Sequence, residues 1–150
     1  MSRRHPGVNG FLFGTGLAFA QERSPINLLD NSSFERVDKQ QAWSVKEGSV
    51  FRFTSDVSLT GKYSLNWDNS NPDTYELVTQ KVPLTSGRSY ELSAWIKTED
   101  VKGVRESGAT IALGYSGHDE KYITGGPHPG GQKGTRDWWQ LIAYTGAVPQ

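Results

Sequence analysis

The sequence contains no cysteine, so disulfide bonds and thiolate metal sites are excluded. Its sixteen basic and sixteen acidic residues cancel. A chain without net charge lacks the field of one sign that non-specific binding to nucleic acid or to an anionic membrane requires. Long hydrophobic runs are missing too, because the longest one, at 11–20, is too short to span a bilayer. The 150 residues suffice for one domain with a core of its own.

Amphipathic helices are also missing, because no window sustains apolar residues at helical spacing. Seventeen Gly, seven Pro and 11% aromatic residues are typical of an all-β domain with many turns. Strand-like segments follow one another at fairly even spacing, at 49–55, 62–68, 74–84, 89–98, 109–116 and 138–146. With no helices to cover a parallel sheet, the strands are expected to pair antiparallel in a β-sandwich.

The clearest alternation runs along 89–98. Apolar side chains occupy one face of this predicted strand and mostly polar ones the other: Tyr90, Leu92, Ala94 and Ile96 against Glu91, Ser93, Trp95 and Lys97. Trp67 shares a face with Tyr63 and Leu65 in the 62–68 strand, and Trp43 follows a polar connector. Both tryptophans are therefore predicted to lie in the core.

The first twenty residues have the order of a secretory signal. Arg3 and Arg4 precede the apolar run at 11–20, which ends in Ala18-Phe19-Ala20, small residues where a signal peptidase reads them. We therefore predict a signal peptide at 1–20, a mature domain at 21–150 and a secreted or periplasmic location.

Five segments in order carry a family resemblance. They are "NLLDNSSFE", "AWSV", "SLTGKYSLNW", "VPLTSGRSYELSAWIKTEDV" and "DWWQLIAYTGAVP". From about Asn27 to Pro149 the chain resembles the carbohydrate-binding modules of families four, nine and twenty-two. This resemblance implies a galactose-binding-like jelly roll that binds polysaccharide without catalysis. It also implies a glycoside hydrolase as attached or partner domain.

One departure from the family concerns the end of the chain. After the "YTGAVP" strand the family continues for about two more strands, which here are absent. In a jelly roll the first and last strands lie side by side, so the domain is expected to be C-terminally truncated, with an open sheet edge.

The resemblance also implies sugar-binding residues. Tyr115 and Tyr122 flank the polar loop "SGHDEK", where family members keep aromatic residues that stack on sugar, although each could equally be a half-buried strand residue. Gln80 occupies a position where an amide often bonds to sugar. Of the adjacent Trp138 and Trp139, the second is predicted to be exposed to ligand. For Trp95, packing is the favoured interpretation and sugar contact the alternative.

A structural calcium ion is the predicted cofactor, since the family commonly holds one near its first strand. The matching positions are Glu35, with carbonyls from the turn around Ser58 and Lys62. The Asp of the final strand that usually completes the shell is absent. His118, Asp119, Glu120 and His128 match no transition-metal spacing.

These residues are compatible with three functions. The leading hypothesis is non-catalytic polysaccharide binding. The second is a structural or adhesion β-sandwich that binds a protein partner after losing its sugar site. A small hydrolase is the third and least favoured, because no pair of carboxylates is marked out for acid–base work and no catalytic residue is predicted.

Overall fold

The computed structural model describes residues 26–71, 74, 76–102 and 108–149. Its elements are a short 3-10 helix, η1 (Val37–Ala42), and six strands, β1 (Phe51–Thr54), β2 (Ser64–Trp67), β3 (Glu91–Val101), β4 (Gly114–Ser116), β5 (Tyr122–Gly125) and β6 (Gly134–Tyr144). All three strand pairs are antiparallel. The described chain is thus all-β and antiparallel, as predicted. Within these residues no helix is long and apolar enough to cross a membrane. The predicted signal at 1–20 lies outside them.

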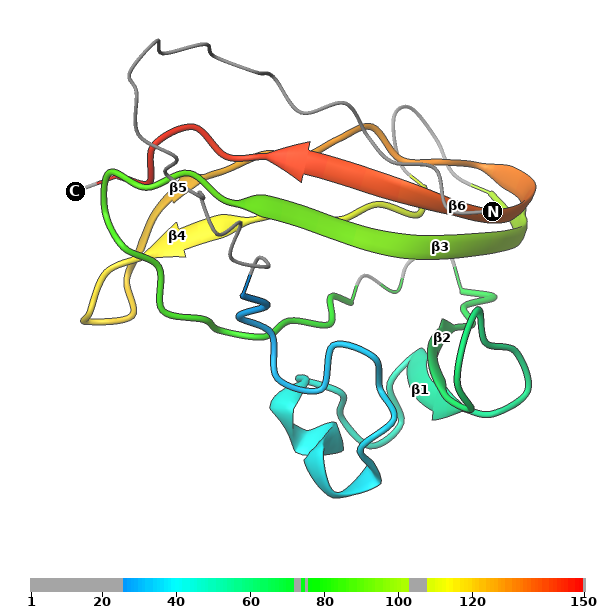
Figure 1. Ribbon diagram of the computed structural model, residues 1–150. Helices are drawn as coiled ribbons and strands as arrows, with labels where there is room; N and C mark the ends of the chain where they lie inside the picture. Colours follow the sequence, from blue (N-terminus) through cyan, green and yellow to red (C-terminus); the bar gives the residue numbers. More distant parts are fainter. Residues whose placement is uncertain (1–25, 72–73, 75, 103–107, 150) are drawn as a thin grey trace, which may run out of the picture.

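The longest feature is a two-stranded ribbon of β3 and β6, each eleven residues long. It forms the upper layer of the molecule, above η1, β1 and β2 (Figure 1). The predicted alternation along β3 is confirmed, because Leu92, Ala94 and Ile96 are half-buried and the residues between them are exposed. We call the half-buried side of the ribbon its inner face and the exposed side its outer face. The ribbon is therefore a half-buried sheet with one face in solvent.

The lower layer contains η1 and the short pair of β1 and β2 (Figure 1). Phe53 lies opposite Leu65 in this pair, and both are half-buried. The Phe34 ring lies 5.4 Å from that of Trp43 and 6.1 Å from that of Phe53, centroid to centroid. Trp43 also donates its indole N–H to the Asn31 carbonyl at 3.2 Å. This aromatic cluster joins the first described residues to β1, and it gives the half-buried Trp43 the packing role predicted for it.

Few of the described residues are buried, and Trp67 is not among them. In the part of the chain that the structure describes, the only buried apolar residues are Ala143 and Val148, and no side chain is fully buried. Trp67 is 43% exposed at the end of β2, opposite Phe51. Its predicted place in the core is wrong, because no further strand among the described residues joins the β1–β2 pair to cover this ring.

Two segments differ from the predicted strands. No strand forms in the described part of 74–84. This segment instead bonds to the chain near Trp43, where Ser44 donates its N–H to the Thr79 carbonyl and accepts the Thr79 N–H on Oγ, at 3.0 and 2.8 Å. The Ser44 hydroxyl thus accepts the hydrogen bond that a backbone carbonyl would accept in a β-ladder. Pro83 has no backbone N–H to donate to a partner strand. Conversely, β5 was not predicted, since its polar, Gly-flanked sequence lacks apolar alternation.

Candidate functional site

The β4–β5 hairpin carries both tyrosines predicted to stack on sugar. Its turn is closed by the Gly117 N–H, which donates to the Lys121 carbonyl at 2.9 Å, and by the Glu120 N–H, which donates to Gly117 at 3.0 Å. Glu120 has a φ of 63°, a left-handed conformation that is uncommon outside glycine. The pairing also shifts register between Tyr115 and Ser116. Such a bulge re-aims the side chains on its strand.

Tyr122 is the most exposed aromatic side chain of the hairpin, at 70%. It extends over a glycine pair, because Gly114 lies opposite Gly125 in the ladder. A Cβ added at Gly114 would lie 3.7 Å from Tyr122 Cε2, and one at Gly125 would lie 3.3 Å from its hydroxyl oxygen. An added Cβ would be in ordinary contact with the ring at Gly114 and tight against its hydroxyl at Gly125, so the ring packs against this glycine pair. Its other side is open to solvent.

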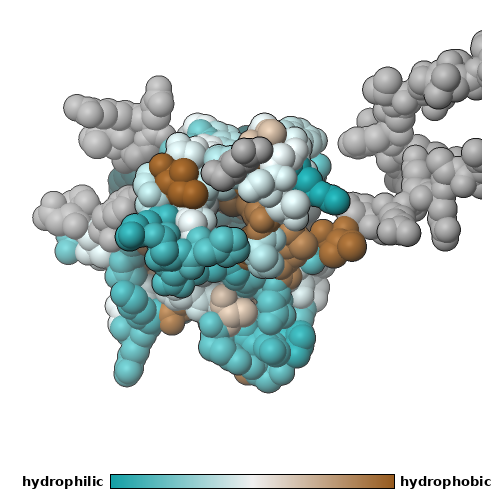
Figure 2. All heavy atoms as spheres, turned by 90° about the vertical axis from the view of Figure 1, so that its left-hand side faces the viewer, coloured by the Kyte–Doolittle hydropathy of each residue, from teal (hydrophilic) through white to brown (hydrophobic). Residues whose placement is uncertain are grey.

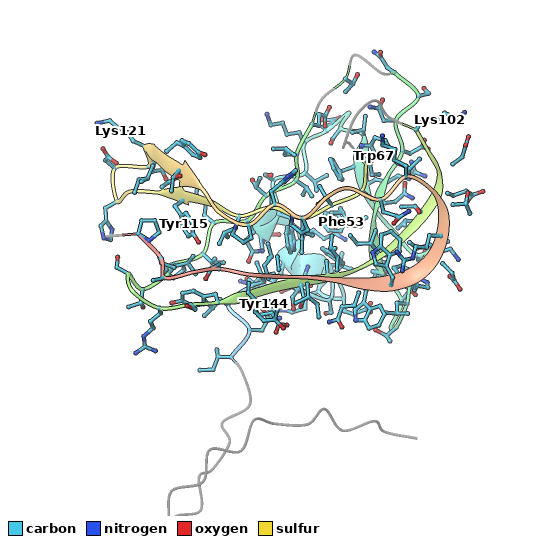
Figure 3. All side chains as sticks on the ribbon, turned by 90° about the horizontal axis from the view of Figure 1, so that it is seen from above. Phe53, Trp67, Lys102, Tyr115, Lys121 and Tyr144 are labelled. Atoms are coloured by element: carbon cyan, nitrogen blue, oxygen red, sulfur yellow. The ribbon has the colours of Figure 1, made fainter. Side chains whose placement is uncertain are left out.

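Tyr115 lies on the opposite face of the same hairpin. It follows Gly114, whose missing side chain would point toward Tyr122, and neighbouring residues of a strand point to opposite faces. Its ring instead approaches Gly126, where an added Cβ would be 3.0 Å from Tyr115 Cε2. Figure 3 shows Tyr115 between the hairpin and the rest of the molecule, with Lys121 at the tip. Tyr115 is half-buried, so the structure gives it the packing role that was the alternative interpretation.

The carboxylates at the hairpin tip are both paired with lysines. Lys121 Nζ lies 3.0 Å from Asp119, and Lys81 Nζ lies 2.8 Å from Glu120. Hydrogen bonds from the side chain and the backbone N–H of Lys121 lower the pKa of Asp119. The hydrogen bond and the charge of Lys81 lower the pKa of Glu120. The tip is thus held ionised, and the Lys81 pair ties it to the 76–84 segment. Figure 2 shows this end of the molecule as mostly hydrophilic, with apolar residues in separate patches.

Gln80 has a different role from the hairpin tyrosines, because its amide binds the chain's own backbone. Its Oε1 accepts the Asp30 N–H at 2.7 Å and its Nε2 donates to the Asp30 carbonyl at 2.9 Å. A half-buried amide needs hydrogen-bond partners, and here the partner is the chain's own backbone. Gln80 therefore holds the first described residues to the 76–84 segment. Its amide is engaged there, and we do not propose it as a residue that contacts sugar.

Trp95 and Trp139 belong to the ribbon, in a different sheet from Tyr122. Trp95 is 52% exposed on the outer face of β3, so its ring is only partly packed, and contact with sugar stays a prediction. Trp139 lies opposite Ile96, on the inner face. The prediction that Trp139 is the exposed member of its pair is therefore wrong. Trp138 and Trp139 are both half-buried. Of these two, Trp138 lies on the side of the outer face.

Two contacts explain the surroundings of these tryptophans. The Arg136 guanidinium lies over the Trp139 ring, 4.7 Å from its centroid, so one face of that ring is already occupied by a cation. The outer face also exposes two apolar residues that were not singled out from the sequence: Ile142, diagonal to Trp95, and the 69% exposed Tyr144 further along, opposite Glu91. The signal was available in their alternation with Leu141 and Ala143.

The residues predicted for calcium do come together. Glu35 Oε1 accepts the backbone N–H groups of Lys62 and Tyr63, at 2.9 and 2.8 Å. Ser58 Oγ donates to the Gly61 carbonyl at 3.1 Å, inside the same turn. Calcium takes six to eight oxygen ligands. Glu35 supplies one carboxylate, whose Oε1 already accepts two backbone N–H groups. These residues therefore do not form a complete calcium shell.

Other metal sites find no support in the described part of the chain, which has no group of three or more His, Asp or Glu side chains placed to hold an ion. No protein-family model, curated protein or solved structure matches this sequence. The function is therefore inferred from the geometry of the site itself.

Proposed function

We propose that this chain is a non-catalytic polysaccharide-binding module with the galactose-binding-like jelly-roll architecture. The observation that carries the proposal is the exposed Tyr122 ring over the Gly114–Gly125 pair. Export by the segment at 1–20 and action beside a glycoside hydrolase are parts of the same proposal.

The chemistry of sugar recognition supports this assignment to Tyr122. A pyranose presents C–H groups on its faces and hydroxyl groups around its rim, so it is bound by a flat aromatic face with polar groups nearby. The two glycines let the Tyr122 ring lie close to the hairpin, and its opposite face is open to a flat ligand. Ser116, directly opposite Tyr122 in the ladder, supplies a hydroxyl beside the ring.

Binding is favoured over hydrolysis by the state of the nearby carboxylates. A glycosidase needs one carboxyl group whose raised pKa keeps it protonated as the general acid. At the hairpin the pKa values of Asp119 and Glu120 are instead lowered by their lysine partners. Neither carboxyl is suited to donate a proton to a leaving group.

Affinity electrophoresis of the folded chain in gels that contain xylan, β-glucan or mannan tests the proposal. We expect slower migration in at least one of these gels relative to a gel without polysaccharide. Unchanged migration in all of them, from a sample with a cooperative unfolding transition, would contradict it. The alternative function, an interaction domain that binds protein, rests on a different feature, the edge of β3 that no described strand pairs with.

A further inference from the structure

One edge of β3 presents backbone groups that pair with no described strand. The Tyr90 carbonyl accepts the Thr145 N–H at 2.9 Å, so Tyr90 turns its backbone toward the β6 side. Backbone groups alternate between the two edges of a strand. Leu92, Ala94 and Ile96 therefore face β6, while Glu91, Ser93 and Trp95 turn their N–H and C=O groups away from it. This regular alternation runs up to the register shift between Ile96 and Thr98. β6 is the only described strand that pairs with β3.

The side chains of these three residues, with that of Lys97 at the register shift, form a row of four on the outer face, and all four are exposed. Along the row the order is acid, hydroxyl, aromatic and base. This order is complementary to itself when one copy is reversed. In an antiparallel pair of β3 edges centred on Ala94, Glu91 lies opposite Lys97 of the second copy, and Ser93 lies opposite its Trp95.

We propose that two copies of this chain associate through their β3 edges, antiparallel, with the two-fold axis at Ala94. The result is a continuous four-stranded sheet in the order β6-β3-β3-β6. Each contact occurs twice, as a two-fold axis requires, so the interface contains two Glu91–Lys97 pairs. On the inner face the same register places Leu92 opposite Ile96 of the second copy, apolar against apolar.

The charges select this register over its neighbours. A pairing centred on Trp95 places Glu91 opposite Glu99 of the second copy, which is repulsive, and one centred on Ser93 places Glu91 opposite Trp95. Lys97 is already held on the outer face, where its Nζ lies 3.1 Å from Asp137. The second copy adds a carboxylate on the other side of the same ammonium group.

The outward edge of β6 lacks such a code. On the outer face it has the uncharged residues Trp138, Gln140, Ile142 and Tyr144, and its one acid there, Asp137, is already paired with Lys97 of the same chain. No pair of opposite charges along that edge fixes a register. On β3 the exposed Trp95 adds an apolar contribution, because the two Trp95 rings are diagonal neighbours across the new pair. The β3 edge is therefore the one that specifies a second copy.

Sedimentation velocity of the full chain over a range of concentrations tests the proposal. We expect a monomer–dimer equilibrium whose dissociation constant rises by roughly tenfold in Glu91→Lys and in Lys97→Glu, since each change makes two attractive pairs repulsive. An equimolar mixture of the two variants should recover the wild-type affinity, because in the heterodimer every pair is again opposite in sign. Recovery on mixing cannot result from misfolding of either variant.

A proline variant tests the edge itself. Ser93→Pro removes an N–H that points away from β6, so the ribbon survives and the dimer is lost; Ala94→Pro is the matched control that breaks the ladder to β6. A wild-type chain that stays monomeric to millimolar concentration would overturn the proposal. So would a dimer that is indifferent to Ser93→Pro and to both charge reversals. Sugar binding by Tyr122 concerns a different sheet and is independent of either result.

Discussion

The Glu35 carboxylate closes a turn 27 positions further along the chain, because its Oε1 accepts the backbone N–H of Lys62 at 2.9 Å. The Tyr63 N–H donates to the same oxygen. One side chain thus satisfies two donors at the entrance to β2, and it joins the first described segment to the β1–β2 pair. Hydrogen bonds to a charged acceptor are among the stronger ones in proteins.

Removing this carboxylate should destabilise the fold. We expect Glu35→Ala to lower the free energy of unfolding by about 1–3 kcal/mol, since two backbone donors lose their acceptor. Glu35→Gln, which keeps an oxygen acceptor, should cost less. Urea unfolding with chelator and with added Ca²⁺ measures both effects. If the loss in Glu35→Ala is the same under both conditions, the clamp acts without calcium; a stabilisation by Ca²⁺ that only the wild type shows would instead place an ion there.

Gly61 should tolerate no side chain because of the same carboxylate. It has a φ of 69°, and a Cβ at this position would collide with Glu35 Oε1. Gly48 is a matched control, with a φ of 74° and open space around it. We expect Gly48→Ala to cost about 1 kcal/mol for the left-handed backbone alone, and Gly61→Ala to cost clearly more. Equal unfolding midpoints for the two variants would show that the collision is relieved at no cost.

Gln80 should matter for stability and not for sugar binding. Gln80→Ala removes the two hydrogen bonds to the Asp30 backbone and should lower the free energy of unfolding by about 1–2 kcal/mol. Gln80→Glu retains an acceptor for the Asp30 N–H but loses the donor, so its effect should be intermediate. Thermal unfolding measures the loss. A fall in polysaccharide affinity without a fall in stability would return Gln80 to the binding site.

The sequence predicted those features that depend on local pattern. The alternation along β3 identified both its faces, and the long-range meeting of Glu35 with the turn at Lys62 followed from the family resemblance. Features that depend on a partner strand were not accessible in this way. Which of Trp138 and Trp139 faces outward is set by the register against Ile96. The exposure of Trp67 follows from a pair of strands that no other described strand covers.

Tyr122 and Tyr144 offer a direct contrast for the proposed binding site. Both are about equally exposed, at 70% and 69%, but only Tyr122 lies over a glycine pair. We expect Tyr122→Ala to weaken polysaccharide binding by about 1–3 kcal/mol, while Tyr144→Ala leaves the affinity unchanged. Tyr122→Phe keeps the ring and should retain most of it. Affinity electrophoresis of the three variants distinguishes stacking on this ring from non-specific contact, since equal losses in Tyr122→Ala and Tyr144→Ala would exclude a dedicated platform.

The Lys81–Glu120 pair should give the hairpin tip a defined pH response. Because the hydrogen bond and charge of Lys81 lower the pKa of Glu120, this carboxyl binds protons less readily in the folded than in the unfolded chain. The contribution of the pair to stability is therefore complete above the ordinary Glu pKa and is lost as the pH falls through the lowered one. An NMR titration of the Glu120 carboxyl carbon measures this.

Lys81→Ala should return the pKa of Glu120 toward its ordinary value, while Lys121→Ala should raise the pKa of Asp119 and leave that of Glu120 largely unchanged. A Glu120 titration that is the same in Lys81→Ala as in the wild type would show that the hairpin is not tied to the 76–84 segment in solution.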